Sequence, residues 1–339
     1  MPPNLVEGEG AVLGRMQILG TGSYAPERIL TNHDLEKMVA TSDSWIRERT
    51  GIRERRIAAD GELTSDMAVA AARKALEMAE TDPADLDMII VATISPDMPM
   101  PSCAMIVQAK LGATKAFAFD LSAACAGSLY GMTIADQFIR SGSAKRVLVI
   151  GAELLSRLVD WTDRNTSVLF GDAAGALVLG PSVSPDRGLL SAHLHSDGTM
   201  APVLCIRGGG SQFPQSESVL QSGMHKIAMN GREVYKFAVR VLPEALAEAL
   251  AANGVTAADI DHVVSHQANV RIMESVLGRA GIPMERCWIN LDRYGNTSSA
   301  SLPISLDEAN RAGRLQPGDL IAMMAIGAGM AWGSALMRW

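Results

Sequence analysis

The chain has 339 residues, 48% of them hydrophobic and 20% charged, and a net charge of −7. This composition excludes an intrinsically disordered chain, and the length suits two domains or one fused pair. The acidic balance argues against a general polyanion binder, so we expect no nucleic-acid partner. The longest apolar run, LIAMMAIGAGMAW, contains two glycines and is too short to span a bilayer, so we expect no membrane segment.

The N-terminus and the cysteines indicate the compartment. Residues 1–16 are expected to form an acidic N-terminal extension that lacks the basic and apolar segments of a secretion signal. The four cysteines, Cys103, Cys125, Cys205 and Cys287, have no CxxC spacing, which argues against a zinc or thioredoxin-like motif. Scattered cysteines in a long chain suggest a reducing compartment, so we predict a cytoplasmic protein.

In chain order, the expected elements form two similar series. Residues 76–93 predict a helix, a turn and a buried strand, residues 117–128 a strand and a helix start, and residues 135–152 a helix and a strand. Residues 250–267, 288–299 and 306–328 repeat this order, the first pair at a shift of 174 residues. The repeat predicts an α/β duplication with halves at 17–183 and 184–339; chance similarity of alanine-rich helices is the alternative. Residues 207–218 are expected to form a surface loop.

Cys125 lies in DLSAACAGSLYG, between a strand-like and a helix-like segment. A helix N-terminus lowers the pKa of a thiol, and the surrounding alanines and Gly127 leave room for a substrate carbonyl. Cys125 is therefore a candidate nucleophile. The alternative is a buried structural cysteine, the usual state of a free cysteine.

Two polar residues of the second half are candidate partners of Cys125. His266 ends a predicted strand, where ligands of α/β folds collect. Asn296 is either a helix cap or an amide donor to a developing enolate oxygen. Because the duplication places Cys125 and Asn296 at nearly equivalent turns, we expect the three side chains to meet at the centre. The glycine-rich segment GAGMAWG (327–333) is a candidate source of an oxyanion-hole N–H.

Several separated motifs together resemble one enzyme family. They are WIRERTGIRERR (45–56), ACAG around Cys125, FGDAAGA (170–176), SHQANVRI (265–272) and YGNTSSAS (294–301). From about Gln17 to Trp339 the chain resembles β-ketoacyl-acyl-carrier-protein synthase III, an initiating condensing enzyme of the thiolase superfamily. The resemblance implies a thiolase-like five-layer αβαβα sandwich and a homodimer with residues 100–121 near its interface.

The resemblance also implies a Cys125–His266–Asn296 triad and a ping-pong reaction. Cys125 would take an acyl group from acyl-CoA, with the N–H groups of Cys125 and Ala328 binding the oxyanion. Malonyl-acyl-carrier protein would then lose CO₂, and His266 and Asn296 would bind the enolate oxygen. Attack on acyl-Cys125 would give a 3-oxoacyl-carrier protein and initiate fatty acid synthesis. The route requires neither a metal nor a redox cofactor.

The remaining implied positions concern substrates. Those matching CoA contacts are Thr41, Trp45, Arg49, Arg164, Gly231 and Asn269. Met100 and Phe170 match the acyl pocket, with Met100 reaching across the dimer into the partner's pocket. Lys236, Arg271 and Arg279 match a basic patch for the acidic carrier protein, although a solvated helix face is the alternative for each. An adaptable methionine at position 100 suggests a primer longer or more branched than acetyl.

Other functions on the same fold stay open at this stage. An acyltransferase or condensing enzyme of specialised, polyketide-type metabolism would use the same thiol, but O-acylation needs no enolate donor, so Asn296 favours condensation. A catalytically silent partner subunit would have lost a triad member. The family's glycine triplet reads Gly327-Ala328-Gly329 here, and an alanine would crowd the oxyanion hole if its φ were positive.

Overall fold

Two sheets, each covered by helices, organise residues 14–339, the part of the chain that the computed structural model describes. The first half contributes β1 (Met16–Tyr24), β4 (Met88–Ala92), β5 (Phe117–Leu121), β6 (Val147–Glu153) and β7 (Ala173–Pro181). Their order in the sheet is β1-β7-β6-β4-β5, and β4 pairs in parallel with both β5 and β6. β4 and β6 are buried along their whole length, as expected for parallel strands with helices on both faces.

The second half repeats this arrangement with β8 (Gly188–Ser196), β11 (His262–Ser265), β12 (Leu320–Gly327) and β13 (Ala331–Arg338). Their order, β11-β12-β13-β8, corresponds to β4-β6-β7-β1 of the first sheet. A parallel bridge between Val263 and Cys287 extends the sheet on the side where β5 lies in the first half. The predicted α/β duplication is therefore present. The predicted boundary after residue 183 lies in the connection between β7 and β8.

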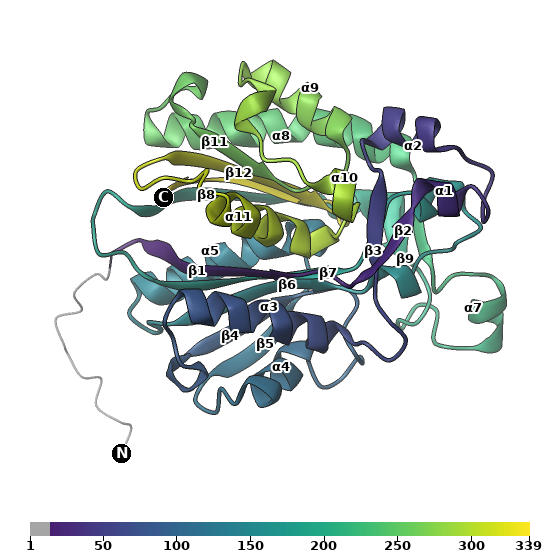
Figure 1. The fold of residues 1–339 in the computed structure, drawn as a ribbon, viewed down its shortest axis with the longest axis horizontal. Coiled ribbons are helices and arrows are strands. Elements are labelled where there is room, and N and C mark those ends of the chain that lie inside the picture. The colour runs from purple at the N-terminus through teal and green to yellow at the C-terminus, as the bar shows by residue number, and fades with distance from the viewer. Residues whose placement is uncertain (1–13) are drawn as a thin grey trace.

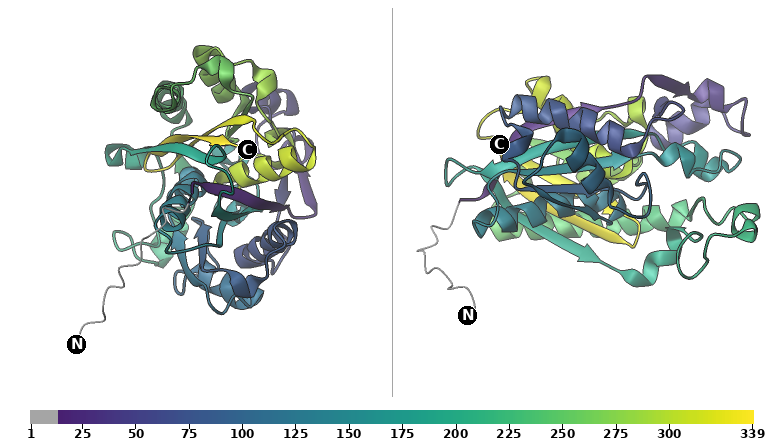
Figure 2. Two further views of the ribbon diagram at one scale, coloured as in Figure 1. Left: turned by 90° about the vertical axis from the view of Figure 1, so that its left-hand side faces the viewer. Right: turned by 90° about the horizontal axis from the view of Figure 1, so that it is seen from below.

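The helices complete five layers. They are α3 (Thr64–Met78) and α4 (Cys103–Leu111) on the outside of the first sheet, α5 (Gly127–Arg140) and α11 (Ser301–Arg311) between the sheets, and α8 (Gly231–Asn253) and α9 (Val270–Ala280) outside the second (Figure 1). Figure 2 shows the same layers from two further sides. Leu129 and Met132 of α5 belong to one buried cluster with Leu302 and Leu306 of α11, so the core between the sheets joins both halves. The αβαβα prediction is confirmed.

The shorter elements gather at one end of the molecule, on the right of Figure 1. They are β2 (Arg28–Thr31), α1 (Asn32–Leu35), α2 (Asp43–Thr50), β3 (Glu54–Ile57), α6 (Arg164–Ser167), β9 (Leu204–Ile206), α7 (Glu217–Gln221), β10 (Ile227–Met229) and α10 (Leu291–Tyr294). Residues 207–216 form the predicted loop, and α7 begins at the end of that segment. No helix of residues 14–339 is long and apolar enough to cross a membrane. Most of the predicted extension, residues 1–13, lies outside the described residues.

The backbone corrects the register of the repeat at the central turns. Two 3-10 turns, η2 (Ala124–Ala126) and η7 (Ser298–Ala300), precede the central helices at a spacing of 174 residues, the same as that of β4 and β11. Their first residues share an uncommon positive φ, 45° at Ala124 and 49° at Ser298. The counterpart of Cys125 is therefore Ser299, and Asn296 lies three residues before it.

Candidate active site

Cys125 lies in turn η2, where the chain leaves β5 and enters α5, and is 7% exposed. The end of β12 packs directly against this turn. A Cβ atom on Gly327 would lie 2.6 Å from the Cys125 nitrogen and 2.9 Å from the Ala123 carbonyl oxygen, so only glycine permits the approach. The glycine-rich segment thus borders the thiol. Its positive φ falls on Gly329, at 139°, and Ala328 does not share it.

The thiol of Cys125 is protonated at rest. Burial raises its pKa to about 12, a hydrogen bond with the Ser298 side chain lowers it, and the negative charge of Glu153 raises it. The start of α5 favours the thiolate, because backbone N–H groups at a helix N-terminus attract negative charge. The proton must therefore leave as the sulfur reacts.

His266 follows β11 and is 4% exposed. Burial lowers the pKa of its imidazole to about 4, so the ring is neutral near pH 7. Nδ1 lies 2.7 Å from Ser301 Oγ, which also donates to the Ser298 carbonyl oxygen at 2.8 Å. When the Ser301 hydroxyl donates to Nδ1 instead, Nε2 carries the ring proton and becomes a donor.

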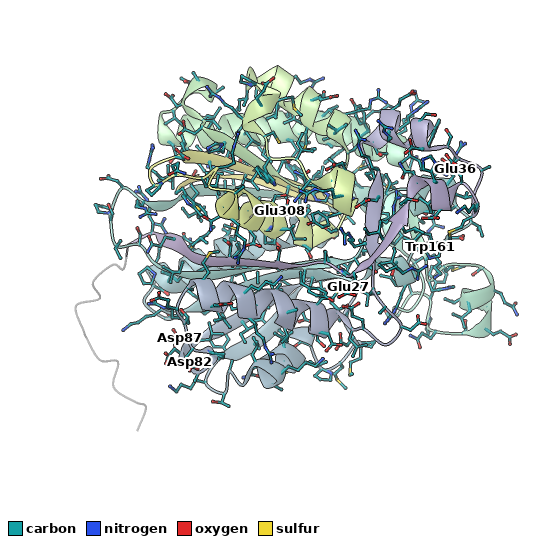
Figure 3. The ribbon with its side chains drawn as sticks, in the orientation of Figure 1. Glu27, Glu36, Asp82, Asp87, Trp161 and Glu308 are labelled. Carbon is teal, nitrogen blue, oxygen red and sulfur yellow. The ribbon has the colours of Figure 1, made fainter. Side chains whose placement is uncertain are left out.

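Asn296 is held by both its backbone and its side chain. Its N–H donates to the Leu169 carbonyl at 2.8 Å, and its carbonyl accepts from Gly171 N at 3.1 Å. The side-chain Oδ1 accepts from Ser298 N at 2.9 Å, which leaves Nδ2 to donate toward the cavity. Glu308 of α11, labelled in Figure 3, accepts a hydrogen bond from the Tyr294 hydroxyl at 2.8 Å. This bond stabilises α10, the helix that comes just before Asn296 in the chain.

The structure brings the three predicted triad residues to one cavity of about 110 Å³. Gly231, Asn269 and Phe170 also line it. It shares Leu169, Met229 and Gly231 with an outer cavity of about 560 Å³, and Cys125, Phe170 and Leu204 with an inner cavity of about 450 Å³. The three cavities are therefore neighbours, and the cavity of the triad lies between the outer cavity and the inner cavity.

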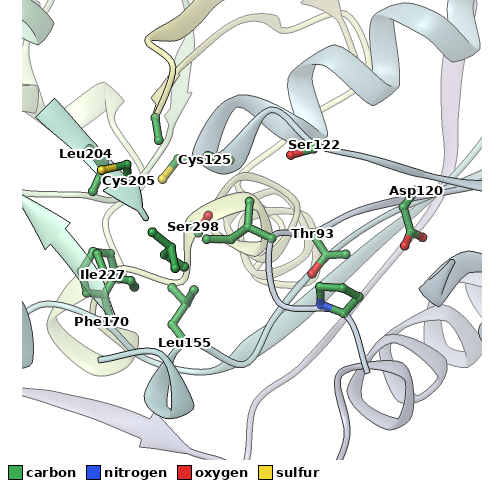
Figure 4. Close-up of a pocket in the computed structure, with 15 residues that line it drawn as sticks. Thr93, Asp120, Ser122, Cys125, Leu155, Phe170, Leu204, Cys205, Ile227 and Ser298 are labelled. Carbon is green, nitrogen blue, oxygen red and sulfur yellow. The ribbon is translucent and has the colours of Figure 1, made fainter. Parts of the chain in front are cut away.

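The inner cavity is mainly apolar (Figure 4). Its apolar wall consists of Ile94, Leu155, Phe170, Leu204, Ile206 and Ile227, and Ala328 and Ser298 border it beside Cys125. Thr93, Asp120 and Ser122 lie together on one side of it in Figure 4. Except for Phe170 and Ala328, sequence reasoning missed these lining residues. No sequence signal identifies them, because aliphatic residues that line a cavity look like core residues.

The outer cavity contains part of the predicted CoA set. Trp45, Arg164 and Gly231 line it, and the Arg164 guanidinium carbon lies 4.6 Å from the centre of the Trp45 ring. Arg49 lies 5.5 Å from the same ring. The Oγ1 of Thr41 is buried and has no hydrogen-bond partner among the described residues. Because Arg164 rests on Trp45, a planar ring enters between them only after the guanidinium moves.

The other predicted contacts lie outside these cavities. Met100 is 84% exposed and is not among the described residues that line the cavities of its own chain, so its placement in a partner's pocket stays a prediction. Lys236 on α8 and Arg271 and Arg279 on α9 are exposed on the two packed outer helices. Lys236 pairs with Glu233 at 2.9 Å, and Arg279 donates to the Val239 carbonyl at 2.7 Å.

Sequence reasoning also missed two residues at the centre of the site, Glu153 and Ser298. Glu153 ends β6 and is fully buried. Ser298 Oγ donates to Glu153 Oε1 at 2.9 Å. The sequence does contain a signal for Glu153, because it is the one charged residue of the buried strand VLVIGAE and lies at the carboxyl end of that strand.

The duplicated five-layer sandwich, with a thiol, an imidazole and an amide at its centre, defines a thiolase-like condensing enzyme. Models of 3-oxoacyl-[acyl-carrier-protein] synthase III match residues 119–198 and, for its C-terminal part, 250–339. The chain is 53% identical to the β-ketoacyl-[acyl-carrier-protein] synthase III of Caldanaerobacter subterraneus, over 95% of this chain and 97% of the relative. It is 54% identical to that of Symbiobacterium thermophilum over the same shares.

Solved structures agree. The crystal structure of 3-oxoacyl-[acyl-carrier-protein] synthase III from Aquifex aeolicus has a TM-score of 0.88 at 46% identity, covering 96% of this chain and all of that one. A priming β-ketosynthase of a polyketide pathway has a TM-score of 0.88 at 36% identity, covering 96% and 97%. This chain belongs to the β-ketoacyl-acyl-carrier-protein synthase III family.

Proposed function

We propose that this protein initiates fatty acid synthesis by condensing the acyl group of an acyl-CoA with malonyl-acyl-carrier protein. The observation that carries the proposal is a row of three neighbouring cavities: an outer cavity at Trp45 and Arg164, the cavity of Cys125, His266 and Asn296, and an apolar inner cavity. These features suit a nucleotide, a thioester and an acyl chain, in that order. The names of the relatives support the same assignment.

In the first half-reaction, Cys125 Sγ attacks the thioester carbonyl of acyl-CoA. The N–H groups of Cys125 and Ala328 stabilise the tetrahedral oxyanion, and such a donor contributes about 10²- to 10³-fold to the rate. The carbon–sulfur bond to CoA then breaks. The proton lost by the Cys125 thiol balances the departing CoA thiolate, so one thioester replaces another. The acyl chain lies in the apolar inner cavity.

In the second half-reaction, malonyl-acyl-carrier protein loses CO₂, and the electron pair of the broken bond forms an enolate. His266 Nε2–H and Asn296 Nδ2–H donate hydrogen bonds to its oxygen. A neutral imidazole suits this task, because the step creates negative charge and needs donors rather than a strong base. The carbanion attacks the acyl-Cys125 carbonyl, 3-oxoacyl-carrier protein leaves, and Cys125 regains a proton. The route uses no metal and no redox cofactor.

The remaining predicted residues are assigned to contacts with the two substrates. Trp45 and Arg164 stack on the CoA adenine, while Arg49, Thr41, Gly231 and Asn269 contact the rest of CoA. The exposed cations Lys236, Arg271 and Arg279 bind the acidic carrier protein. We place the reaction in the cytoplasm.

A second copy of the chain completes the proposed enzyme as a homodimer. Four large apolar side chains from the end of β4 to the start of β5 are exposed: Met98 by 44%, Met100 by 84%, Met105 by 51% and Phe117 by 47%. Such a group of exposed apolar side chains supports burial against another protein surface. Met100 would then reach the partner's acyl pocket. Size measurement of the wild-type chain and of Phe117→Glu tests this, and a monomeric wild type contradicts it.

Mass spectrometry of the intact protein tests the proposed reaction. Incubation with a panel of acyl-CoAs should add one acyl group to wild type and none to Cys125→Ala. Malonyl-acyl-carrier protein should then remove the group with release of CO₂. His266→Ala and Asn296→Ala should still acylate but condense at least about a hundredfold more slowly, the effect of losing one donor to a developing oxyanion. Normal condensation by both variants contradicts their roles.

Priming of a specialised, polyketide-type pathway is a second candidate, since a solved priming β-ketosynthase is 36% identical to this chain. It uses the same two half-reactions, so the acyl-CoA panel separates the two. Strict preference for acetyl-CoA favours fatty acid initiation and rejects the longer or branched primer suggested by Met100. Acyl transfer without CO₂ release rejects both candidates.

A further inference from the structure

Glu153 is a buried carboxylate at the centre of the molecule that the proposed reaction does not use. It is fully buried at the end of β6. Hydroxyl and amide groups donate to it: Thr93 Oγ1 at 3.4 Å, Ile94 N at 3.2 Å and Ser95 Oγ at 2.6 Å to Oε2, and Ser298 Oγ at 2.9 Å to Oε1. Ser299 Oγ lies 3.1 Å from Oε1 and 2.7 Å from the Ala92 carbonyl oxygen. Burying a charged group without a cation is costly, so this arrangement requires a reason.

The two carboxylate oxygens of Glu153 bind different halves of the chain. Oε2 accepts from residues 93–95, directly after β4 of the first half. Oε1 accepts from Ser298 of turn η7, which precedes the central helix of the second half. The first half thereby sets the position of turn η7, whose Ser298 N–H donates to the Asn296 side chain.

Ser298 contacts each member of the triad directly or through one group. Its N–H donates to Asn296 Oδ1 at 2.9 Å. Its carbonyl accepts from Ser301 Oγ, which lies 2.7 Å from His266 Nδ1. Its side chain borders the inner cavity beside the thiol of Cys125. A φ of 49° is unusual for serine, and such conformations persist only where the surroundings enforce them.

We propose that Glu153 is a positioning residue that acts through Ser298 on Cys125 and Asn296 together. The inference rests on the proposed function for the roles of these two residues. Ser298 has one hydroxyl proton. While Ser298 donates this proton to Glu153, the proton does not reach the neighbouring sulfur of Cys125. Once the thiol loses its own proton, the sulfur anion competes with Glu153 for the Ser298 donor. The carboxylate thus favours the resting thiol and holds the Asn296 turn in place.

The titratable groups around Cys125 determine whether each substitution should raise or lower the pKa of the thiol. Ionised Glu153 raises the pKa of the thiol; burial raises the pKa of Glu153 itself, and hydrogen bonds from Ser95, Ile94 and Ser298 lower it. His266 lines the cavity of Cys125 from the end of β11 and is neutral near pH 7. Glu153→Gln removes the negative charge, so the thiol pKa should fall and alkylation at a fixed pH should become faster. Ser298→Ala removes a hydrogen bond that lowers the thiol pKa, so alkylation should become slower.

The test measures alkylation of Cys125 by iodoacetamide between about pH 6 and pH 9, with peptide mass mapping to exclude the other cysteines. We expect the rate to rise about tenfold in Glu153→Gln and to fall about tenfold in Ser298→Ala, the effect of one unit of thiol pKa. Condensation should fall about tenfold more than acylation in Glu153→Gln, because Asn296 loses its support. Asp172→Asn is the matched control, since Asp172 is equally buried but accepts from Ala58 and Ser156.

Opposite alkylation changes in the two variants support the proposal. Equal loss of both half-reactions with an unchanged alkylation rate, as in the Asp172→Asn control, means that Glu153 only stabilises the fold and overturns it. If Glu153→Gln does not fold, the Ser298→Ala variant alone tests the proposal. An alkylation rate equal to that of wild type in Ser298→Ala also overturns it. The alkylation assay needs no acyl substrate, so a wild-type protein that takes no acyl group rejects the proposed function without affecting this measurement.

Discussion

Replacement of Gly327 by alanine tests the contact between the end of β12 and the Cys125 turn. The new Cβ would lie 2.6 Å from the Cys125 nitrogen, 2.9 Å from the Ala123 oxygen and 3.0 Å from the Ala126 nitrogen. All three are backbone atoms, so no side chain can rotate away. Reaching an ordinary contact of 3.4 Å requires the turn or the strand to move by about 0.8 Å.

That displacement acts on the oxyanion hole, because Cys125 N–H is one of its two proposed donors. A misplacement of about 1 Å can cost about a hundredfold in rate, and overpacking a core typically costs about 1–3 kcal/mol of stability. We therefore expect Gly327→Ala to acylate about a hundredfold more slowly and to unfold at a lower temperature. Single-turnover acyl transfer followed by mass spectrometry and thermal unfolding measure the two effects.

Gly278→Ala is the matched control for this substitution. Gly278 lies in α9, has no atom within 4 Å of its ideal Cβ position and has no unusual φ. Alanine there should leave acylation unchanged and stabilise the protein by about 0.5–1 kcal/mol. Acylation at the wild-type rate by Gly327→Ala would refute the packing of the glycine-rich segment against the thiol.

Three further predictions concern the cavities and His266. Trp45→Ala should raise KM for acyl-CoA without changing KM for an acyl-pantetheine thioester, and equal changes for both contradict stacking on adenine. Leu155→Trp should lower kcat/KM for long acyl-CoAs more than for short ones, since it fills the inner cavity of about 450 Å³, and a uniform loss refutes that assignment. Burial lowers the pKa of His266 from 6.5 to about 4, so the unfolded chain binds a proton at a higher pH than the folded chain does. The free energy of unfolding should therefore fall by about 3 kcal/mol as the pH drops from about 6.5 to about 4. Denaturant unfolding should show a weaker acid loss of stability in His266→Ala, and an unchanged loss contradicts the neutral buried imidazole.

The repeat in the sequence was enough to predict the duplicated α/β fold. Buried parallel strands leave continuous apolar runs, and these recur in the second half, 174 residues on for β4 and β11 and 173 for β6 and β12. Alignment of the two halves by residue type nevertheless made Asn296 the counterpart of Cys125, whereas the backbone conformation makes Ser299 its counterpart. The difference arises because turns are equivalent through their φ angles, which Ala124 and Ser298 share, and side-chain identity does not report those angles.

The sequence by itself determined the α/β duplication, the thiol at a strand-to-helix turn and the imidazole at a strand end. These depend on local patterns: apolar periodicity, small residues and the position of a polar residue after a strand. Only the tertiary structure decided which groups surround the thiol. Glu153, Leu155 and Ser298 come from segments far from Cys125 in the chain. The sequence around a buried carboxylate or leucine does not indicate which residues lie next to it in space. Their meeting depends on the packing of two sheets around two central helices, because that packing brings the carboxyl ends of β4 and β6 against the turn before α11.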